Sequence, residues 1–389
     1  MSFQSGAGST KGEPALDFVF KPAAVASGLS NFMKGNLLKH RGGLVCVVLS
    51  GAWRRPPATS ISLTKSQLDE VTPLLYGSGA AALGWWRVRD TELGKTSSAE
   101  VLHQAYRLLV LQSAIHEERI KTVFRLLRGQ SIEAILVKGW AAAGLYPERA
   151  LRPYGDIDLC VKASDWKAAG DVLASPEAAG CWTDLHEGFS ELNDRTIDQL
   201  FERSRLLDLD DLHVRVLSAE DHLALLAIHL LKHGAWRPLW LCDIGAAIES
   251  LPSDFDWDTC LGPNKRRAGW IACVIGLAHR LLGARIQHLP TAIRNQKLPD
   301  WLVHNVLKQW ENPFATNQPP MSHPLPIMES LRHPNGIWKA IRARWPNPII
   351  ATISVNGKLN GAPRFPYQLG NCVSRLGHFL AHLPKELRD

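Results

Sequence analysis

The chain has 389 residues, of which 46% are hydrophobic and 21% charged, and its formal net charge is +7. This length predicts two or three packed units, and the hydrophobic fraction excludes wholesale disorder. No apolar stretch approaches the roughly 20 residues that span a bilayer, and the first residues lack the apolar centre of a signal peptide. We therefore expect a cytoplasmic protein without a membrane partner.

The cysteines and basic residues do not mark a specialised site. The seven cysteines are scattered, and no pair has the CxxC spacing of a zinc or redox site. We interpret them as buried thiols in a reducing cytoplasm. The positive charge is compatible with a nucleotide or nucleic-acid partner, but Lys and Arg are spread along the chain and form no single binding patch.

In chain order, the sequence predicts five regions. They are a flexible tail (1–14), a mostly helical region (15–130), a core of strands and helices (131–215), a helical domain (216–285) and an extension rich in Pro, Trp and Arg (286–389). In the first helical region, the apolar run 44–49 predicts a buried strand or helix segment. Further on, a helix capped by Ser97 or Ser98 is expected to continue to about Leu127, because its apolar residues recur at the helical period.

The core region alternates between strand and helix patterns. Short apolar or alternating runs predict strands over 132–137, 156–161 and 181–189, and a helix is expected over 164–173. This order predicts an α+β fold of modest size.

The pattern after the core is helical. Ser218 is followed by two acidic residues, which favours a helix start, and this helix should continue to about His233. Further helices are expected over 240–248 and 270–282.

Two acidic residues on the second predicted strand give the most informative chemical signal. Asp156 and Asp158 are two positions apart, so on a strand both carboxylates project from the same face. Carboxylates this close repel each other unless a cation lies between them, and hard oxygen ligands suit Mg²⁺, or Mn²⁺ in its place. A DxD pair alone is weak evidence, because a solvated strand edge gives the same letters.

Three neighbouring features strengthen this interpretation. Lys138 and Gly139 end the preceding strand in a turn whose free N–H groups suit phosphate oxygens. Asp184 lies on the third predicted strand, where it would complete a three-carboxylate cluster, and the guanidinium of Arg152 is placed to hold a phosphate. Together these groups are what two-metal phosphoryl-type transfer requires.

The motifs occur in an order that resembles a known bacterial family. They are residues 135–142 (ILVKGWAA), 145–147 (LYP), 152–159 (RPYGDIDL), 184–186 (DLH), 216–223 (VLSAEDHL), 229–233 (HLLKH), 240–244 (WLCDI) and 256–258 (DWD). Over roughly residues 70–285 the chain resembles the "uncharacterised nucleotidyltransferase" family of the polymerase-β-like nucleotidyltransferase superfamily. The run 344–348 (RWPNP) is similar to that family's C-terminal element.

The resemblance implies a small mixed-sheet nucleotidyltransferase core between an N-terminal helical segment and a C-terminal helical domain. It implies that Asp156 and Asp158 coordinate the metals and that Asp184 is the third acid, as ligand or as base. The implied reaction moves a nucleoside monophosphate from an NTP, with ATP as the default donor, to a hydroxyl or phosphate acceptor and releases pyrophosphate. A small molecule, a peptide, a protein or an RNA end would suit as the acceptor.

The resemblance also implies that the turn after the first strand holds the nucleotide phosphates. The residues concerned are Gly139 and its neighbours Lys138 and Trp140, with Arg152 nearby. Bulky Trp140 departs from the wider superfamily pattern, which has Gly or Ser at this position.

Four other residues are candidates for acceptor-side or supporting roles: His186, His229, His233 and Asp243. His229 and His233 are four apart on a helix, as in some zinc sites, but the Glu of an HExxH motif is missing, so we favour a packing role. For Asp243 we likewise favour a structural role over that of a general base. A second Asp-Leu-His at 211–213 is an alternative third acid, which we rank below Asp184 because it adjoins the helical domain.

Two other function classes remain open from the sequence. A metal-dependent glycosyltransferase also uses a DxD motif, but it needs neither the Lys138–Gly139 turn nor Asp184 and requires a larger Rossmann-like region ahead of the motif. A non-catalytic nucleotide- or RNA-binding protein is compatible with the positive charge, although all three acids of the expected cluster are present.

Overall fold

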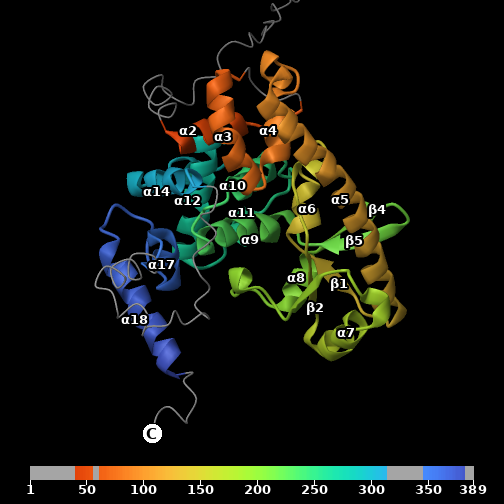
Figure 1. The fold of residues 1–389 in the computed structure, drawn as a ribbon. Helices are drawn as coiled ribbons and strands as arrows, with labels where there is room; N and C mark the ends of the chain where they lie inside the picture. Colours follow the sequence, from red (N-terminus) through yellow and green to blue (C-terminus); the bar gives the residue numbers. More distant parts are fainter. Residues whose placement is uncertain (1–39, 56–60, 313–344, 382–389) are drawn as a thin grey trace, which may run out of the picture.

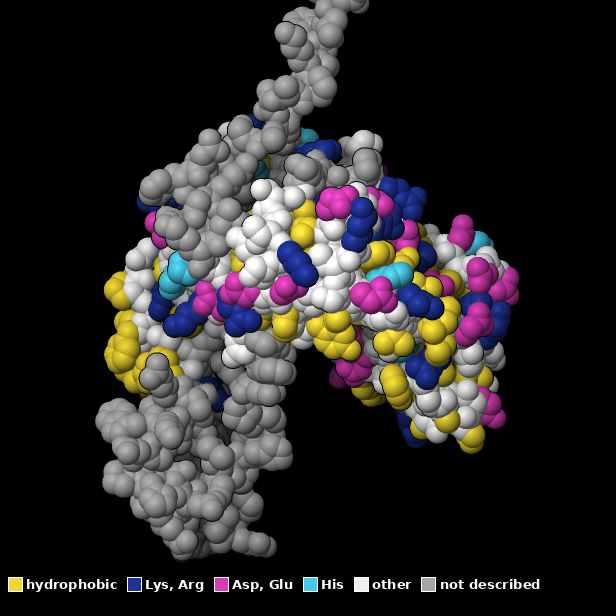
Figure 2. Space-filling model, turned by 45° about the horizontal axis from the view of Figure 1, so that its top comes forward, with side chains coloured by type: hydrophobic (Ala, Val, Ile, Leu, Met, Phe, Trp, Pro, Cys, Tyr) yellow, Lys and Arg dark blue, Asp and Glu magenta, His cyan; other side chains and the backbone are white. Residues whose placement is uncertain are grey.

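The computed structural model describes residues 40–55, 61–312 and 345–381. Their fold is α+β, as predicted, with helical segments on either side of a five-stranded mixed sheet (Figure 1). The predicted tail at 1–14 and part of the predicted extension, 313–344, lie outside the described residues. Figure 2 shows acidic and basic side chains interspersed on the face drawn, in keeping with the even spread of Lys and Arg along the sequence.

The described part of the chain begins with the α-helices α2 (Arg41–Leu49), α3 (Lys65–Gly77), α4 (Ala81–Val88) and α5 (Ser97–Gly129). The apolar run 44–49 is therefore helical, and the long helix expected to end near Leu127 is confirmed. The predicted caps Ser97 and Ser98 are wrong, since Thr96 caps α5. Its extended backbone (φ −87°, ψ 158°) lets the side chain accept a hydrogen bond from the Ala99 N–H.

The five strands are β1 (Ala134–Leu136), β2 (Ile157–Val161), β3 (Thr183–His186), β4 (Arg205–Leu209) and β5 (Leu212–Val216), in the order β3-β2-β1-β5-β4. β2–β3 and β1–β5 are parallel, whereas β1–β2 and β4–β5 are antiparallel. The three predicted strands are confirmed, although each is shorter than expected. Three helices lie between the strands, and they are α6 (Gly139–Ala143), α7 (Trp166–Leu173) and α8 (Ile197–Arg203).

Alternate residues of the strands face two different hydrophobic cores. Leu136 and Leu159 face a core that α5 and α7 complete. Ile135 and Cys160 face the other way, into the core that the N-terminal and C-terminal helices share. Because side chains alternate along a strand, Asp158 lies on the same side as Cys160, toward that shared core. The sheet therefore presents Asp158 to the helical half of the molecule.

The later helices are α9 (Ala219–Lys232), α10 (Pro238–Glu249), α11 (Trp257–Leu261), α12 (Lys265–Leu282), α13 (Thr291–Arg294), α14 (Asp300–Trp310), α17 (Pro348–Ser354) and α18 (Phe365–Ala381). The helices predicted after Ser218 and over 240–248 and 270–282 are confirmed. Ser218 is the cap, because its side chain accepts a hydrogen bond from the Asp221 N–H. Asp221 is itself fully buried and forms ion pairs with Arg195 and Arg203.

The burial of the cysteines agrees with the prediction from the sequence. All seven cysteines are free thiols and all except Cys372 are buried. Within the described ranges, none of the helices has the length and apolarity that crossing a bilayer requires.

His222 on α9 provides a test of this packing. Burial lowers the pKa of His222 to about 4. Below the ordinary pKa of about 6.5, His222 takes up a proton in the unfolded chain but not in the folded chain. The contribution of the buried neutral imidazole to stability is therefore fully present above pH 6.5 and is lost as the pH falls toward 4. Between pH 7.5 and pH 5, the free energy of unfolding should fall by about 2 kcal/mol more in the wild type than in His222→Gln.

Urea unfolding at the two pH values measures this difference. His304→Gln, which removes an exposed imidazole from α14, is the matched control and should keep the pH dependence of the wild type. Equal pH dependence in the wild type and in His222→Gln would contradict the assignment of His222 as a buried neutral imidazole.

Candidate functional site

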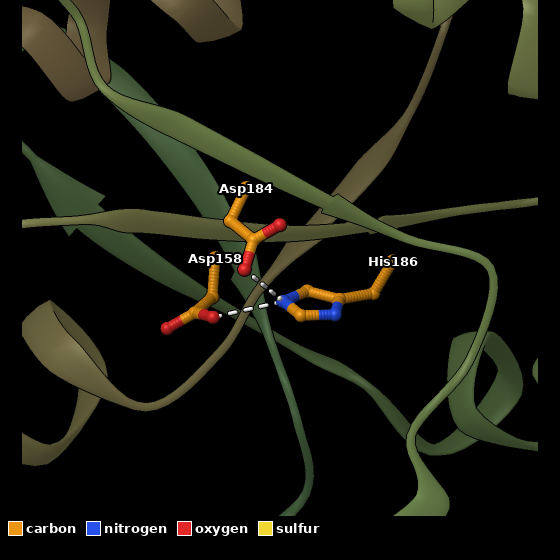
Figure 3. A group of neighbouring side chains, drawn as sticks. All are labelled: Asp158, Asp184 and His186. Atoms are coloured by element: carbon orange, nitrogen blue, oxygen red, sulfur yellow. Dashed lines mark hydrogen bonds and ion pairs between the residues drawn. The ribbon is translucent and has the colours of Figure 1, made fainter. Parts of the chain in front are cut away.

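The pairing of β2 with β3 brings together two acids and a histidine. In the parallel register, Asp158 lies opposite Asp184, and His186 is two positions further along β3 and so shares the face of Asp184. The three side chains point toward one another (Figure 3). One ligand atom from each lies within 4.8 Å of the others, a spacing and a donor set that fit a divalent cation.

The charges in this cluster compensate one another. His186 Nε2 donates to Asp158 Oδ1 at 2.8 Å and lies 3.4 Å from Asp184 Oδ2, and Lys138 Nζ lies 3.3 Å from Asp158 Oδ1. Burial raises the pKa of Asp158, but the hydrogen bond from His186 and the charge of Lys138 outweigh it and leave the pKa below its ordinary value. Asp158 is therefore ionised at neutral pH although only 6% of its side chain is exposed, whereas 61% of the Asp184 side chain is exposed.

The turn after β1 has a strained backbone. Lys138 adopts φ 55° and ψ −122°, a conformation that non-glycine residues rarely occupy and that costs about 1–3 kcal/mol. Gly139 follows, and a Cβ at this position would lie 3.2 Å from the Cβ of Tyr154. Strain of this kind is concentrated at functional sites, and here it accompanies the contact of the Lys138 ammonium with Asp158.

A cavity of about 230 Å³ lies beside the cluster, between the sheet and the helices. Its walls are formed by Lys138, Gly139, Arg152, Pro153, Tyr154, Gly155, Asp156 and Asp158 from the sheet half and by His229, Arg237 and Trp240 from the helical half. Asp156 immediately precedes β2 and is exposed into this space. The expected trio is thus arranged in two parts, with Asp184 beside Asp158 in the cluster and Asp156 beside Asp158 on the cavity.

Arg152 and Asp243 form a buried ion pair at the back of the cavity. The guanidinium donates to Asp243 at 2.9 Å and to the Pro153 carbonyl at 3.2 Å, and the Tyr146 hydroxyl donates to the same carboxylate at 2.7 Å. Asp243 is fully buried. Burial, and then the negative charge of Asp243, raise the pKa of Tyr146. These contacts tie the segment before β2 to α10, which supports the structural interpretation of Asp243.

The other predicted site residues have different environments. Trp140 is only 1% exposed, its indole N–H donates to Glu117, and it is not among the residues that line the cavity. His229 lines the cavity and its ring lies 4.4 Å from that of His233, which is exposed.

Asp211, the acid of the second Asp-Leu-His, does not approach the cluster. It lies in the turn between β4 and β5, at the edge of the sheet opposite to β3. Its carboxylate forms an ion pair with Arg125.

Arg237, Trp240 and Tyr154 line the cavity but were not predicted as site residues. Tyr154 and Trp240 belong to sequence runs that carry the family resemblance, which is a signal that could have identified them. Arg237 precedes Pro238, and a proline at the first helical position is typical of a helix start, so the sequence context of Arg237 gives no such signal.

The buried ion pair gives a testable difference in stability. In Asp243→Asn, Arg152 keeps its charge in a position where only 7% of its side chain is exposed, so the free energy of unfolding should fall by about 3–5 kcal/mol. Tyr146→Phe removes a single hydrogen bond and should cost about 1 kcal/mol. Asp211→Asn, in an exposed pair with Arg125, is the matched control and should cost less than either of the other substitutions. If urea unfolding shows a smaller loss of unfolding free energy for Asp243→Asn than for Tyr146→Phe, this account is contradicted.

The acid–histidine cluster gives a test by metal titration. Asp184→Asn removes a charged ligand, so the dissociation constant for Mn²⁺ in isothermal titration calorimetry should rise by at least about tenfold. Asp208→Asn is the matched control, because Asp208 also pairs with a histidine, His213, but on an exposed edge strand. Equal Mn²⁺ affinity in the wild type and in Asp184→Asn would exclude Asp184 as a ligand.

Comparison with known proteins agrees with this geometry. A family model described as uncharacterised nucleotidyltransferase matches residues 65–184 and 181–283, which together are more than half of the chain. Neither the curated proteins nor the solved structures include a match. The matched residues contain the strained turn, both acids of the cluster and the helices that close the cavity. The chain therefore belongs to the uncharacterised nucleotidyltransferase family.

Proposed function

We propose that this protein is a metal-dependent nucleotidyltransferase that moves a nucleoside monophosphate from an NTP, with ATP as the default donor, to a hydroxyl or phosphate acceptor and releases pyrophosphate. The observation that carries this proposal is the convergence of Asp158, Asp184 and His186 beside a cavity lined by Asp156. Membership of the nucleotidyltransferase family supports it and favours it over glycosyl transfer. The buried free thiols support a cytoplasmic location.

The residues of the cluster fit divalent cations. Asp158 and Asp184 would hold one ion, and Asp156 with Asp158 would hold a second at the cavity. Carboxylate oxygens favour Mg²⁺ or Mn²⁺. An imidazole ligand from His186 suits transition metals better than Mg²⁺, so activity with Mn²⁺ should be compared with activity with Mg²⁺. When bound, such cations lower the pKa of an acceptor hydroxyl and neutralise charge on the triphosphate and the leaving pyrophosphate.

Different residues of the protein would contact the donor and the acceptor. The Lys138 ammonium and the backbone of Gly139 lie on the cavity, where they would contact donor phosphates. Asp184 and His186 are not part of the cavity wall, and Asp184 is largely exposed. We therefore place the donor in the cavity and the acceptor on the Asp184 side of the cluster, where Asp184 serves as a ligand or accepts the acceptor's proton.

Arg152 has a supporting role in this proposal. Its guanidinium donates to Asp243 and to the Pro153 carbonyl, so it fixes the segment that carries Asp156. A phosphate contact from Arg152, as the sequence suggests, would add to this role.

Transfer of label from nucleotides tests the proposal. With ATP labelled at the α-phosphate and Mg²⁺ or Mn²⁺, label should move to an acceptor in a panel containing the protein itself, total RNA, peptides and small hydroxyl compounds. Because Asp158 is central to both candidate metal sites, Asp158→Asn should slow transfer by at least about a hundredfold, whereas the exposed-strand control Asp208→Asn should not.

The position of the label distinguishes the reaction classes. Transfer from γ-labelled but not from α-labelled ATP would indicate a phosphotransferase, and transfer of sugar from UDP-sugars would indicate a glycosyltransferase. Either result would overturn the proposed function, as would nucleotide binding without turnover that Asp158→Asn leaves unchanged.

A further inference from the structure

Arg237 lines the cavity from the helical half and has no role in the chemistry proposed above. It immediately precedes α10 and shares the cavity wall with Trp240 of that helix and with Gly139 and Asp156 of the sheet half. Its position in a cavity beside the candidate metal centre raises the question of what its charge binds.

Contacts with the N-terminal helices hold the Arg237 side chain in place. Its Nε donates to the Ser78 carbonyl at 2.9 Å, and a Cβ on Gly79 would come within 2.3 Å of one of its terminal nitrogens. Gly79 has φ 74°, in the left-handed region that favours glycine. The guanidinium carbon lies 5.8 Å from the centre of a Trp240 ring. The side chain is therefore fixed before any ligand arrives.

The charge of Arg237 is not matched by a close carboxylate. Within the described part of the chain, no carboxylate oxygen lies within 4.0 Å of its guanidinium, whereas the buried Arg152 and Arg195 each have such a partner. Burial, and then the charge of Arg152, lower the pKa of Arg237 to about 10, so the group stays charged at neutral pH. A half-buried cation that is repelled by its neighbour disfavours folding and is typical of a binding site.

We propose that Arg237 binds oxygens of the outer phosphates of the donor triphosphate, an inference that rests on the proposed nucleotidyltransferase function. The planar guanidinium presents paired N–H donors that match two oxygens of a phosphate. The phosphate also supplies the counter-charge that no nearby carboxylate provides to Arg237. The donor is the substrate concerned because the same cavity contains Lys138, Gly139 and both acids of the DxD motif. The triphosphate would then contact the sheet half and the helical half at once.

Binding of polyphosphates with and without a nucleoside tests this proposal without any need for an acceptor. In isothermal titration calorimetry with Mg²⁺, the dissociation constants of Arg237→Gln for ATP and for inorganic tripolyphosphate should rise by about tenfold or more, because charge-assisted hydrogen bonds are lost. The dissociation constant for AMP should change by less than about twofold, since AMP lacks the outer phosphates. Arg237→Lys, which keeps the charge, should recover part of the loss.

Matched controls separate this effect from damage to the fold. Arg125→Gln removes an arginine that pairs with Asp211 at the far edge of the sheet, and it should bind all three ligands as the wild type does. Tripolyphosphate should raise the thermal midpoint of the wild type but not that of Arg237→Gln. If Arg237→Gln does not fold, Arg237→Lys decides the outcome, because lysine keeps the charge but lacks the paired N–H donors. Its dissociation constant for tripolyphosphate should still exceed that of the wild type, and a wild-type value would overturn the proposal.

The outcomes distinguish this inference from the proposed function. Tripolyphosphate affinity within twofold of the wild type in Arg237→Gln, no binding of tripolyphosphate by the wild type, or an equal loss of AMP and ATP affinity would each overturn the role of Arg237. Selective loss of polyphosphate binding in a protein that transfers no α-label would support Arg237 as the phosphate ligand while the transfer reaction itself fails.

Discussion

The register of β2 against β3 is the constraint on which the candidate site depends. Parallel pairing places Asp158 opposite Asp184, and the alternation along β3 adds His186 to the same face. A shift of one residue would instead turn Leu185 toward the cluster and move both polar side chains to the other face. That shift is opposed by the core, because Leu159 and Leu185 lie on the opposite face, against the side chains of α5 and α7. Burial of apolar side chains on one face thus fixes the positions of charged side chains on the other.

Two arginines line the cavity, one from the sheet half and one from the helical half, and their surroundings contrast. Arg152 is neutralised by Asp243 and further constrained by Tyr146, so it joins the segment before β2 to α10. A buried ion pair of this kind contributes little net stability, but losing one partner is costly, which makes it an effective means of fixing a position. Arg237 is also held, by a hydrogen bond to the Ser78 carbonyl, but among the described residues it has no such close counter-charge. Arg152 therefore holds the segment before β2 in place, whereas Arg237 leaves positive charge in the cavity for a ligand.

The sequence predicted more of the elements than of their boundaries. Long periodic helices such as α5 and α12 were identified because tertiary packing uses the same apolar stripe that the sequence displays. The hairpin of β4 and β5 was missed, since β4 is an exposed edge strand and its turn contains Asp210 and Asp211 rather than the Asn-Gly or Asp-Gly typical of a tight turn. The cap of α5 moved to Thr96, because the local backbone conformation, which the sequence leaves open among several hydroxyl residues, decides which side chain reaches the free N–H.

By itself, the sequence determined the α+β class and the acids from which a metal site can be built, because spacing along a strand or helix fixes which side chains share a face. The order of its motifs also carried the resemblance to the family. Only the tertiary structure decided how those acids are distributed, with Asp184 and His186 meeting Asp158 in the cluster while Asp156 faces the cavity. It also decided that Arg152 is bound to a buried carboxylate and that Arg237, which precedes α10 some 80 residues further along the chain, lines the same cavity. Such contacts depend on burial and on the pairing of distant segments, and local spacing contains no information about either.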